Sequence, residues 1–170
     1  YGTTALGYDR QTFLGLQLGA ILFMAAGIIV AGWMSDHSTP RLVLMGGCIG
    51  TVLCGLVLAP MLGSGSGLLV FIFLALALLV MGFVYGPLGA WLPGLFPARV
   101  RYTGASIAFN TGGILGGALA PMIAQTLAER GGLVPVGLYL AGAGIISLAG
   151  FAVLKRQVED RSAEILIGLE

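Results

Sequence analysis

Charged residues are scarce in this sequence. Asp, Glu, Lys and Arg make up only 9% of its 170 residues, against about 25% in a typical soluble domain. Hydrophobic residues make up 58%, and the mean hydropathy is +1.01. Because so little polar surface cannot cover a water-soluble core, the composition excludes a soluble enzyme, a nucleic-acid-binding module and a disordered chain. It predicts an integral membrane protein, and the net charge of +1 points to no charged partner.

Histidine and cysteine are also rare. The chain has one histidine and two cysteines, Cys48 and Cys54. Six residues along a helix separate two Cα atoms by about 9 Å, beyond the reach of about 7 Å that a disulfide allows. We therefore predict that both cysteines are small packing residues, and that the chain holds neither a metal nor another cofactor.

Long segments carry no charge at all. They are residues 11–35, 42–98, 102–128 and 131–154. A bilayer core is crossed by about 20 helical residues, so 42–98 crosses twice and turns at the Gly-Ser repeat 63–67. The apolar runs do not alternate, which excludes barrel strands. The predicted fold is an all-α bundle of five transmembrane helices, followed by a cytoplasmic tail at 155–170; the helices are about 12–34, 42–62, 68–95, 104–127 and 134–154.

The positive charges divide unevenly between the two sides of this bundle. Six lie on one side: Arg41, Arg99, Arg101, Lys155, Arg156 and Arg161. Only Arg10 and Arg130 lie on the other. Because short loops rich in Lys and Arg stay in the cytoplasm, we predict a multi-pass inner-membrane protein whose N-terminus is outside and whose C-terminus is cytoplasmic. The sequence has no initiator Met or signal peptide, so we expect at least one upstream helix.

Small residues and prolines form stripes on two helices. One stripe is Gly82, Gly86, Gly89 and Pro93; the other is Ser106, Asn110, Gly113, Gly117 and Pro121. Small residues let membrane helices approach closely, so plain packing explains the glycines. The alternative is that helices slide or bend here during a conformational cycle, because proline removes a backbone donor. The candidate hinge residues are Gly86, Pro87, Gly113, Gly117 and Pro121.

Few polar side chains are expected at membrane depth. The amide of Asn110 cannot be satisfied by hydrocarbon, so it needs either another helix or a hydrated cavity, and both alternatives stay open. Tyr85 directly precedes Gly86-Pro87, where the helix could bend. With Gln17 on the first helix, these three neutral residues are the predicted substrate pathway.

Three segments resemble a known family. Tyr85-Gly86-Pro87, the run 96–106 (FPARVRYTGAS) and the run 115–121 (LGGALAP) are similar to the second half of major facilitator superfamily transporters, and most of all to the metabolite:proton symporters of shikimate, citrate, 2-oxoglutarate, proline and betaine. The resemblance implies that the five helices are the eighth to twelfth of twelve, with a substrate site between two six-helix halves. The implied partners are the N-terminal half of the same transporter, the lipid bilayer, a small-molecule substrate and a proton; no nucleic acid is implied.

The loop after the first helix resembles the superfamily's loop motif. Gly32, Asp36 and Arg41 match that motif, whereas His37, Thr39 and Pro40 depart from it. In the family this loop closes a cytoplasmic gate through ion pairs. The resemblance implies a gate formed by the three matching residues with Arg99 and Arg101, and we expect Asp36 to pair with an Arg or to cap a helix. The departures, and Gly94 where the family has an acid, imply a gate that is weaker or rebuilt.

Acidic residues are absent from the predicted spans. All seven lie in loops, at helix ends or in the tail: Asp9, Asp36, Glu129, Glu159, Asp160, Glu164 and Glu170. A membrane enzyme would need a base or metal ligands inside the bundle, so the chain is not expected to be an enzyme. We predict part of a secondary active transporter, a proton-coupled symporter of a small organic acid or zwitterion, whose proton-binding carboxylates lie upstream. The alternative is a helical membrane protein with a structural or assembly role.

Overall fold

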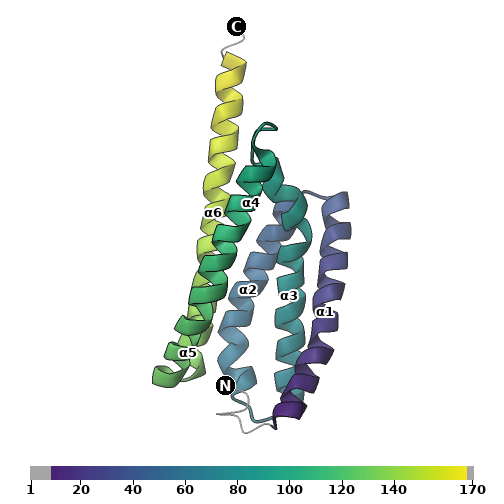
Figure 1. The fold of residues 1–170 in the computed structure, drawn as a ribbon, viewed down its shortest axis with the longest axis vertical. Coiled ribbons are helices and arrows are strands. Elements are labelled where there is room, and N and C mark those ends of the chain that lie inside the picture. Colours follow the sequence, from purple (N-terminus) through teal and green to yellow (C-terminus); the bar gives the residue numbers. More distant parts are fainter. Residues whose placement is uncertain (1–8, 168–170) are drawn as a thin grey trace.

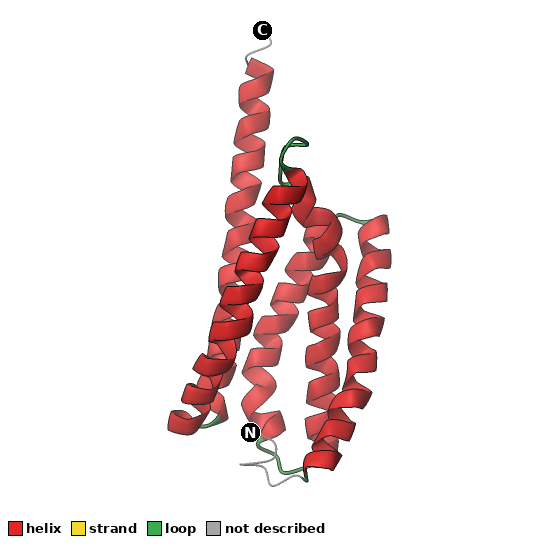
Figure 2. Cartoon of the chain, viewed as in Figure 1, coloured by secondary structure: helices red, strands yellow, loops and turns green. Residues whose placement is uncertain are grey.

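The computed structural model describes residues 9–167, and side chains over residues 9–153. Every long element in this part of the chain is a helix (Figures 1 and 2). The elements are α1 (Arg10–His37), α2 (Pro40–Leu62), α3 (Gly67–Gly94), α4 (Arg101–Ile114), the π-helix η1 (Leu115–Leu119), α5 (Ala120–Gly131) and α6 (Leu133–Ile167). Since α4, η1 and α5 form one continuous span, five helices are long and apolar enough to cross a membrane. The predicted all-α membrane fold with five spans is confirmed.

Local chemistry sets several helix ends. The Asp9 carboxylate accepts a hydrogen bond from the Gln11 N–H at 3.1 Å and caps the start of α1. Pro40 occupies the first position of α2, where a missing N–H costs nothing because the helix has no partner for it. Gly65 turns the chain between α2 and α3 with a φ of +72°, a conformation that favours glycine.

Four of the spans pack in the order α1, α3, α2, α6 (Figure 1). Glycines set the closeness of α1 and α3, because a Cβ added at Gly27 would strike the Leu79 carbonyl oxygen and one at Gly82 the Met24 carbonyl oxygen. Between α2 and α6, a Cβ at Gly55 would lie 2.6 Å from the Gly137 carbonyl oxygen. The backbones are therefore in contact, the arrangement by which small residues join membrane helices.

The core lies between α2 and α3. Cys54, Leu58 and Phe73 are buried together there, and Cys48 is buried one and a half turns before Cys54. Both cysteines are free thiols. Their predicted role as small packing residues agrees with this placement.

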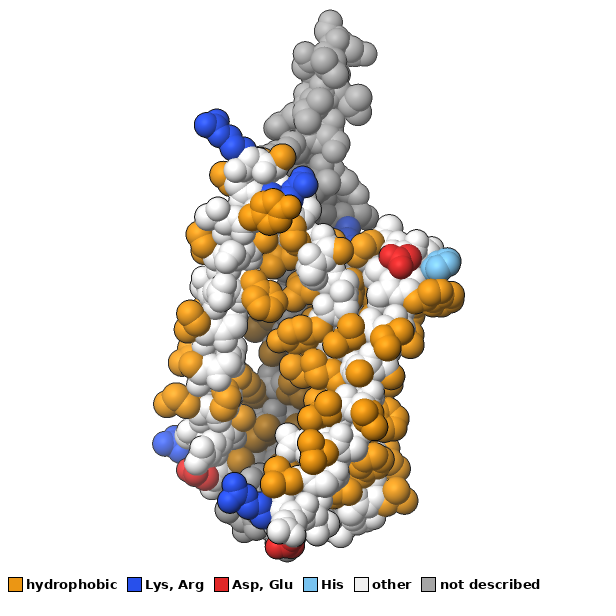
Figure 3. All heavy atoms as spheres, turned by 45° about the vertical axis from the view of Figure 1, so that its right-hand side comes forward, with side chains coloured by type: hydrophobic (Ala, Val, Ile, Leu, Met, Phe, Trp, Pro, Cys, Tyr) orange, Lys and Arg blue, Asp and Glu red, His pale blue; other side chains and the backbone are white. Residues whose placement is uncertain are grey.

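The surface is that of a membrane protein. In Figure 3 the charged side chains gather at the two ends of the molecule, and the surface between them is apolar. Leu18, Leu22 and Ile29 on α1 are each about 70% exposed (67%, 71% and 71%). Such a band suits hydrocarbon rather than water.

The last helix is longer than the sequence predicts. α6 continues to Ile167, through most of the segment that we assigned to a tail. The side chains from residue 154 onward, among them Lys155 and the acids of the tail, lie outside the described residues.

Candidate substrate pathway and gate

The span formed by α4, η1 and α5 stands apart from the other helices. α4 meets α3 near their connection and α5 meets α6, while no residue of α4, η1 or α5 is buried. In Figure 3 a hollow separates this span from α1 and α3. No atom lies within 4 Å of a Cβ added at Gly113 or Gly117. The small and polar face of this span is therefore free of contacts with the described residues.

Asn110 finds its partners on its own helix. Its Nδ2 donates to the Ser106 carbonyl oxygen at 2.8 Å and to the Ser106 Oγ at 3.3 Å. The expectation that the amide needs another helix or a cavity was therefore wrong for its donors, because a side chain on a helix can reach the carbonyl four residues back. Within the described part of the chain its Oδ1 accepts no hydrogen bond, so one acceptor remains for a ligand.

Tyr85 and Asn110 lie equally far from the ends of their helices. Tyr85 is nine residues before the end of α3 at Gly94, and Asn110 is nine residues after the start of α4 at Arg101. At 1.5 Å per residue each lies about 13–14 Å from the end of its helix. Tyr85 is 46% exposed, and its hydroxyl makes no hydrogen bond to another described residue. The structure thus offers two neutral polar side chains well inside the apolar spans.

Gln17 does not join this pair. Gly19 on α1 lies against Phe71 of α3, whereas Gly86 of α3 lies against Ala31 of α1. Gln17 is therefore about 14 residues from the level of Tyr85, which is about 21 Å along α1. The structure places Gln17 towards the opposite end of the bundle.

The predicted ion pairs of the gate are not formed. Asp36 is exposed within α1 and neither pairs with a described cation nor caps a described helix. Arg99 and Arg101 are exposed and have no described ionic partner. A Cβ added at Gly32 would meet no atom within 4 Å, although the Gly32 backbone N lies close to Gly86 of α3. The expected pairing of Asp36 is wrong for this structure, in which Arg41 of the same loop bonds to the Phe151 carbonyl oxygen instead.

Arg41 serves another purpose. Its Nη2 donates to the Phe151 carbonyl oxygen on α6 at 2.7 Å, in a partly buried position. The Phe151 ring also stacks on Trp91 of α3, with ring centroids 5.1 Å apart. Arg41 thus links the start of α2 to α6, a contact across 110 residues that leaves no signal in the sequence.

The two predicted hinges differ. α3 runs unbroken through Pro87, which is fully buried, and a Cβ at Gly86 would lie 2.9 Å from the Ile28 carbonyl oxygen of α1. Gly86 therefore packs against α1, and α3 is continuous at Gly86-Pro87 in this structure, so a hinge there stays a prediction. The fourth span does depart from a regular α-helix, because the π-helix η1 includes Gly117 and ends two residues before Pro121.

Proline explains this π-helix. The ring of Pro121 conflicts with the carbonyl four residues earlier, that of Gly117, and a wider π turn relieves the conflict. Two adjacent glycines, Gly116 and Gly117, make the backbone there easy to deform. This pair of glycines before a proline is the signal by which the π-helix could have been found.

Comparisons with known proteins agree with the geometry. The family model described as "Sugar (and other) transporter" matches residues 3–158. The chain is 43% identical over 148 residues to the inner membrane metabolite transport protein YhjE of Escherichia coli, covering 85% of this chain and 33% of that protein. It is 34% identical to a putative metabolite transport protein of Haemophilus influenzae, covering 94% and 36%, and 31% identical to the cis,cis-muconate transport protein of Acinetobacter baylyi, covering 84% and 33%.

The matches cover these proteins only in part. The chain spans about a third of the length of the curated relatives. No solved structure matches the chain.

Proposed function

Because the chain belongs to the sugar (and other) transporter family of the major facilitator superfamily, we propose that it forms the eighth to twelfth helices of a proton-coupled symporter for a small organic acid or zwitterion. The substrate would bind between these helices and an upstream half and cross by alternating access. The N-terminus of this chain would lie outside and its C-terminus in the cytoplasm, as the positive charges predict.

The observation that carries this proposal is the pair of Tyr85 and Asn110. Both lie well inside an apolar span, and each keeps a polar atom that no other described residue satisfies. A hydroxyl and an amide can bind carboxylate or hydroxyl oxygens without carrying charge. One relative is named for cis,cis-muconate transport, which supports a small organic acid as the substrate class.

The described spans carry charge only at their ends, which supports different roles for the two halves of the transporter. The described acids, Asp9, Asp36 and Glu129, all lie at helix ends. A charge at mid-bilayer costs about 2.5–3.5 kcal/mol on insertion scales and is kept only for a function. We place the proton-binding carboxylate in the upstream half, and assign to this half the neutral contacts to the substrate.

Uptake of labelled organic acids and betaines by cells that produce the complete protein tests the proposal. We expect uptake that requires an inward proton gradient. Tyr85→Phe and Asn110→Ala should each raise KM at least threefold, while Tyr139→Phe on α6 should leave KM unchanged. Unchanged KM in both pathway variants would rule out this pathway. Absence of uptake for every compound would favour the structural role.

A further inference from the structure

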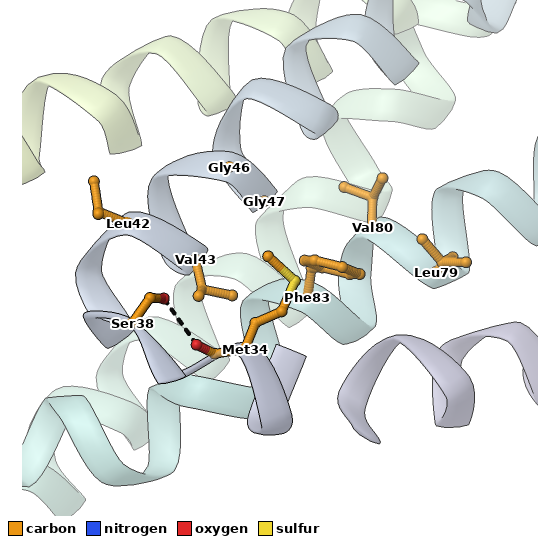
Figure 4. Close-up of a pocket in the computed structure, with 9 residues that line it drawn as sticks. All are labelled: Met34, Ser38, Leu42, Val43, Gly46, Gly47, Leu79, Val80 and Phe83. Atoms are coloured by element: carbon orange, nitrogen blue, oxygen red, sulfur yellow. Dashed lines mark hydrogen bonds between the residues drawn. The ribbon is translucent and has the colours of Figure 1, made fainter. Parts of the chain in front are cut away.

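A cavity lies on the face of the molecule away from the span of α4, η1 and α5. It has a volume of about 320 Å³ and lies where α1 ends and α2 begins, over one side of α3 (Figure 4). α1 contributes Met34, the connection after it contributes Ser38, α2 contributes Leu42 and Gly46, and α3 contributes Leu79 and Phe83. A cavity of this size is within the range of small-ligand sites, about 300–1,000 Å³.

The lining offers little to a polar ligand. Its one hydroxyl, that of Ser38, already donates to the Met34 carbonyl oxygen at 2.8 Å (Figure 4) and keeps only acceptor capacity. The remaining lining side chains are apolar. A ligand in this cavity must therefore be hydrocarbon, because a polar group would lose its hydration and gain no partner.

The cavity is separate from the proposed substrate pathway. Phe83 lines the cavity, and Tyr85 follows it by two residues. Two residues turn a helix by about 200°, so Tyr85 projects from the opposite side of α3. The cavity thus opens on the face of α3 turned away from the pathway.

We propose that this cavity binds one acyl chain of a membrane phospholipid. Three apolar spans form it, and it runs inward from the end of α1 to Leu79, which is fifteen residues before the end of α3. Trp33, which is 62% exposed, lies near the outer end of the cavity, and tryptophan prefers the boundary between hydrocarbon and headgroups. Its ring stacks on His37, with centroids 4.6 Å apart. The apolar face that carries the cavity is surrounded by lipid, so an acyl chain is the hydrocarbon available to fill it. A filled cavity keeps the van der Waals contacts that the lining residues would lose if it were empty.

Gly46 gives a way to close the site. It lines the cavity, and no atom lies within 4 Å of a Cβ added there. A larger side chain at this position therefore begins in open space, and we expect it to occupy part of the cavity. The adjacent Gly47 is different, since its Cβ would lie 2.8 Å from Val84 Cγ2. Gly150→Leu on α6 is the matched control, because Gly150 is exposed and a Cβ added there also meets no atom within 4 Å. Gly150 lies next to Phe151, the residue whose carbonyl oxygen binds Arg41, and does not line the cavity.

The test uses the complete protein in nanodiscs that contain a phospholipid with a photoreactive diazirine in its tail. The protein is first extracted into detergent, which removes loosely bound lipid, and is then illuminated. Mass spectrometry identifies the labelled residues. We expect labelling near Met34, Leu42 and Phe83 to exceed that at the exposed α1 residues Leu18 and Leu22 at least threefold. Gly46→Leu should abolish this excess, and Gly150→Leu should preserve it.

Three results would overturn the proposal. The first is that the cavity residues are labelled no more than Leu18 and Leu22. The second is that the cavity residues are not labelled at all because another segment covers the cavity. The third is that the excess labelling of the cavity persists in Gly46→Leu. If Gly46→Leu does not fold, Gly46→Ala replaces it, since one methyl group enters open space; it should reduce the excess, and an unchanged excess counts against the site.

Discussion

The guanidinium of Arg41 is the one described cation that bonds to a distant helix. Its Nη2 reaches the Phe151 carbonyl oxygen at 2.7 Å and ties α2 to α6. A partly buried hydrogen bond from a charged donor contributes about 1.5–3 kcal/mol. Helices held in part by such single contacts should be sensitive to its loss.

Replacing Arg41 tests this contribution. Arg41→Met keeps the aliphatic stem and removes the donor, so we expect it to lower the thermal unfolding temperature of the detergent-solubilised protein by several degrees, at about 2–4 °C per kcal/mol. Arg99→Met is the control, because Arg99 is exposed; it should change the temperature by less than about 1 °C. Equal shifts in the two variants would contradict the role of the Arg41 bond.

Asp36 carries the second prediction at this scale. It is exposed and unpaired within the described residues, so any partner lies outside these residues or belongs to another conformation. One ion pair at a hydrated surface contributes only about 0–1 kcal/mol, which suits a contact that must break in every cycle. Asp36→Asn should slow uptake about two- to tenfold without changing the amount of protein in the membrane. Asp9→Asn, at the opposite end of α1, should not slow it, and wild-type uptake by Asp36→Asn would exclude Asp36 from the gate.

Sequence reasoning reached part of the candidate site. The sequence places Tyr85 and Asn110 inside two apolar helices, but their equal distance from the helix ends depends on where the structure ends α3 and begins α4, because the predicted bounds of 95 and 104 give ten and six residues. The separation of Gln17 from Tyr85 could not be counted, because it depends on which glycines of α1 and α3 meet. The bond between Arg41 and Phe151 depends on the packing of three helices and was equally out of reach.

At the scale of the element, glycines decide how closely helices pack. Gly27→Val should push α1 away from α3, because its Cβ would collide with the Leu79 carbonyl oxygen. Overpacking of this kind costs about 1–3 kcal/mol, and we expect a lower unfolding temperature and less protein in the membrane. Gly15→Val on the same helix should behave like the unaltered protein, since its Cβ meets nothing within 4 Å. An unchanged unfolding temperature and an unchanged amount of protein in the membrane for Gly27→Val would show that α1 and α3 are not tightly packed at Gly27.

The π-helix gives a prediction of its own. A π turn behaves as one residue inserted into an α-helix, so deleting Gly116 should convert α4, η1 and α5 into one α-helix while keeping the facing of Asn110. Deleting Ala124 in α5 should instead rotate the part that follows by about 100°. We expect the first deletion to retain membrane insertion and stability, and the second to lower both. Equal damage by the two deletions would argue against a separable π turn.

The five spans were predicted from the sequence, whereas the π-helix was missed, because its signal of two glycines before a proline lies outside the hydrophobic pattern. Charge-free runs and the Gly-Ser turn predict five spans, because hydrocarbon tolerates neither charge nor unsatisfied backbone. By contrast, regular spacing placed Asn110, Gly113, Gly117 and Pro121 on one stripe, and this requires an unbroken α-helix. η1 interrupts that spacing, because the strain around Pro121 is a property of the backbone and not of the hydrophobic pattern.

The molecule as a whole covers about a third of the length of its relatives. The described carboxylates lie only at the ends of its spans, so the chain alone should insert into membranes and transport nothing. Reconstitution of the chain in liposomes, with an imposed pH gradient and labelled organic acids, measures this, and the complete protein is the positive control. Proton-coupled uptake by the chain alone would disprove the proposal that the proton-binding carboxylate lies in the upstream half.

The contrast between the packed helices and the fourth span has a mechanical consequence. α1, α3, α2 and α6 touch through backbone at Gly27, Gly82, Gly55 and Gly137, and such contacts resist shear because interiors deform in steps rather than continuously. The span of α4, η1 and α5 is attached near its two ends and has a π turn between them. Compliance is therefore concentrated in that span, and a force applied by a bound substrate would bend it long before it distorted the other four.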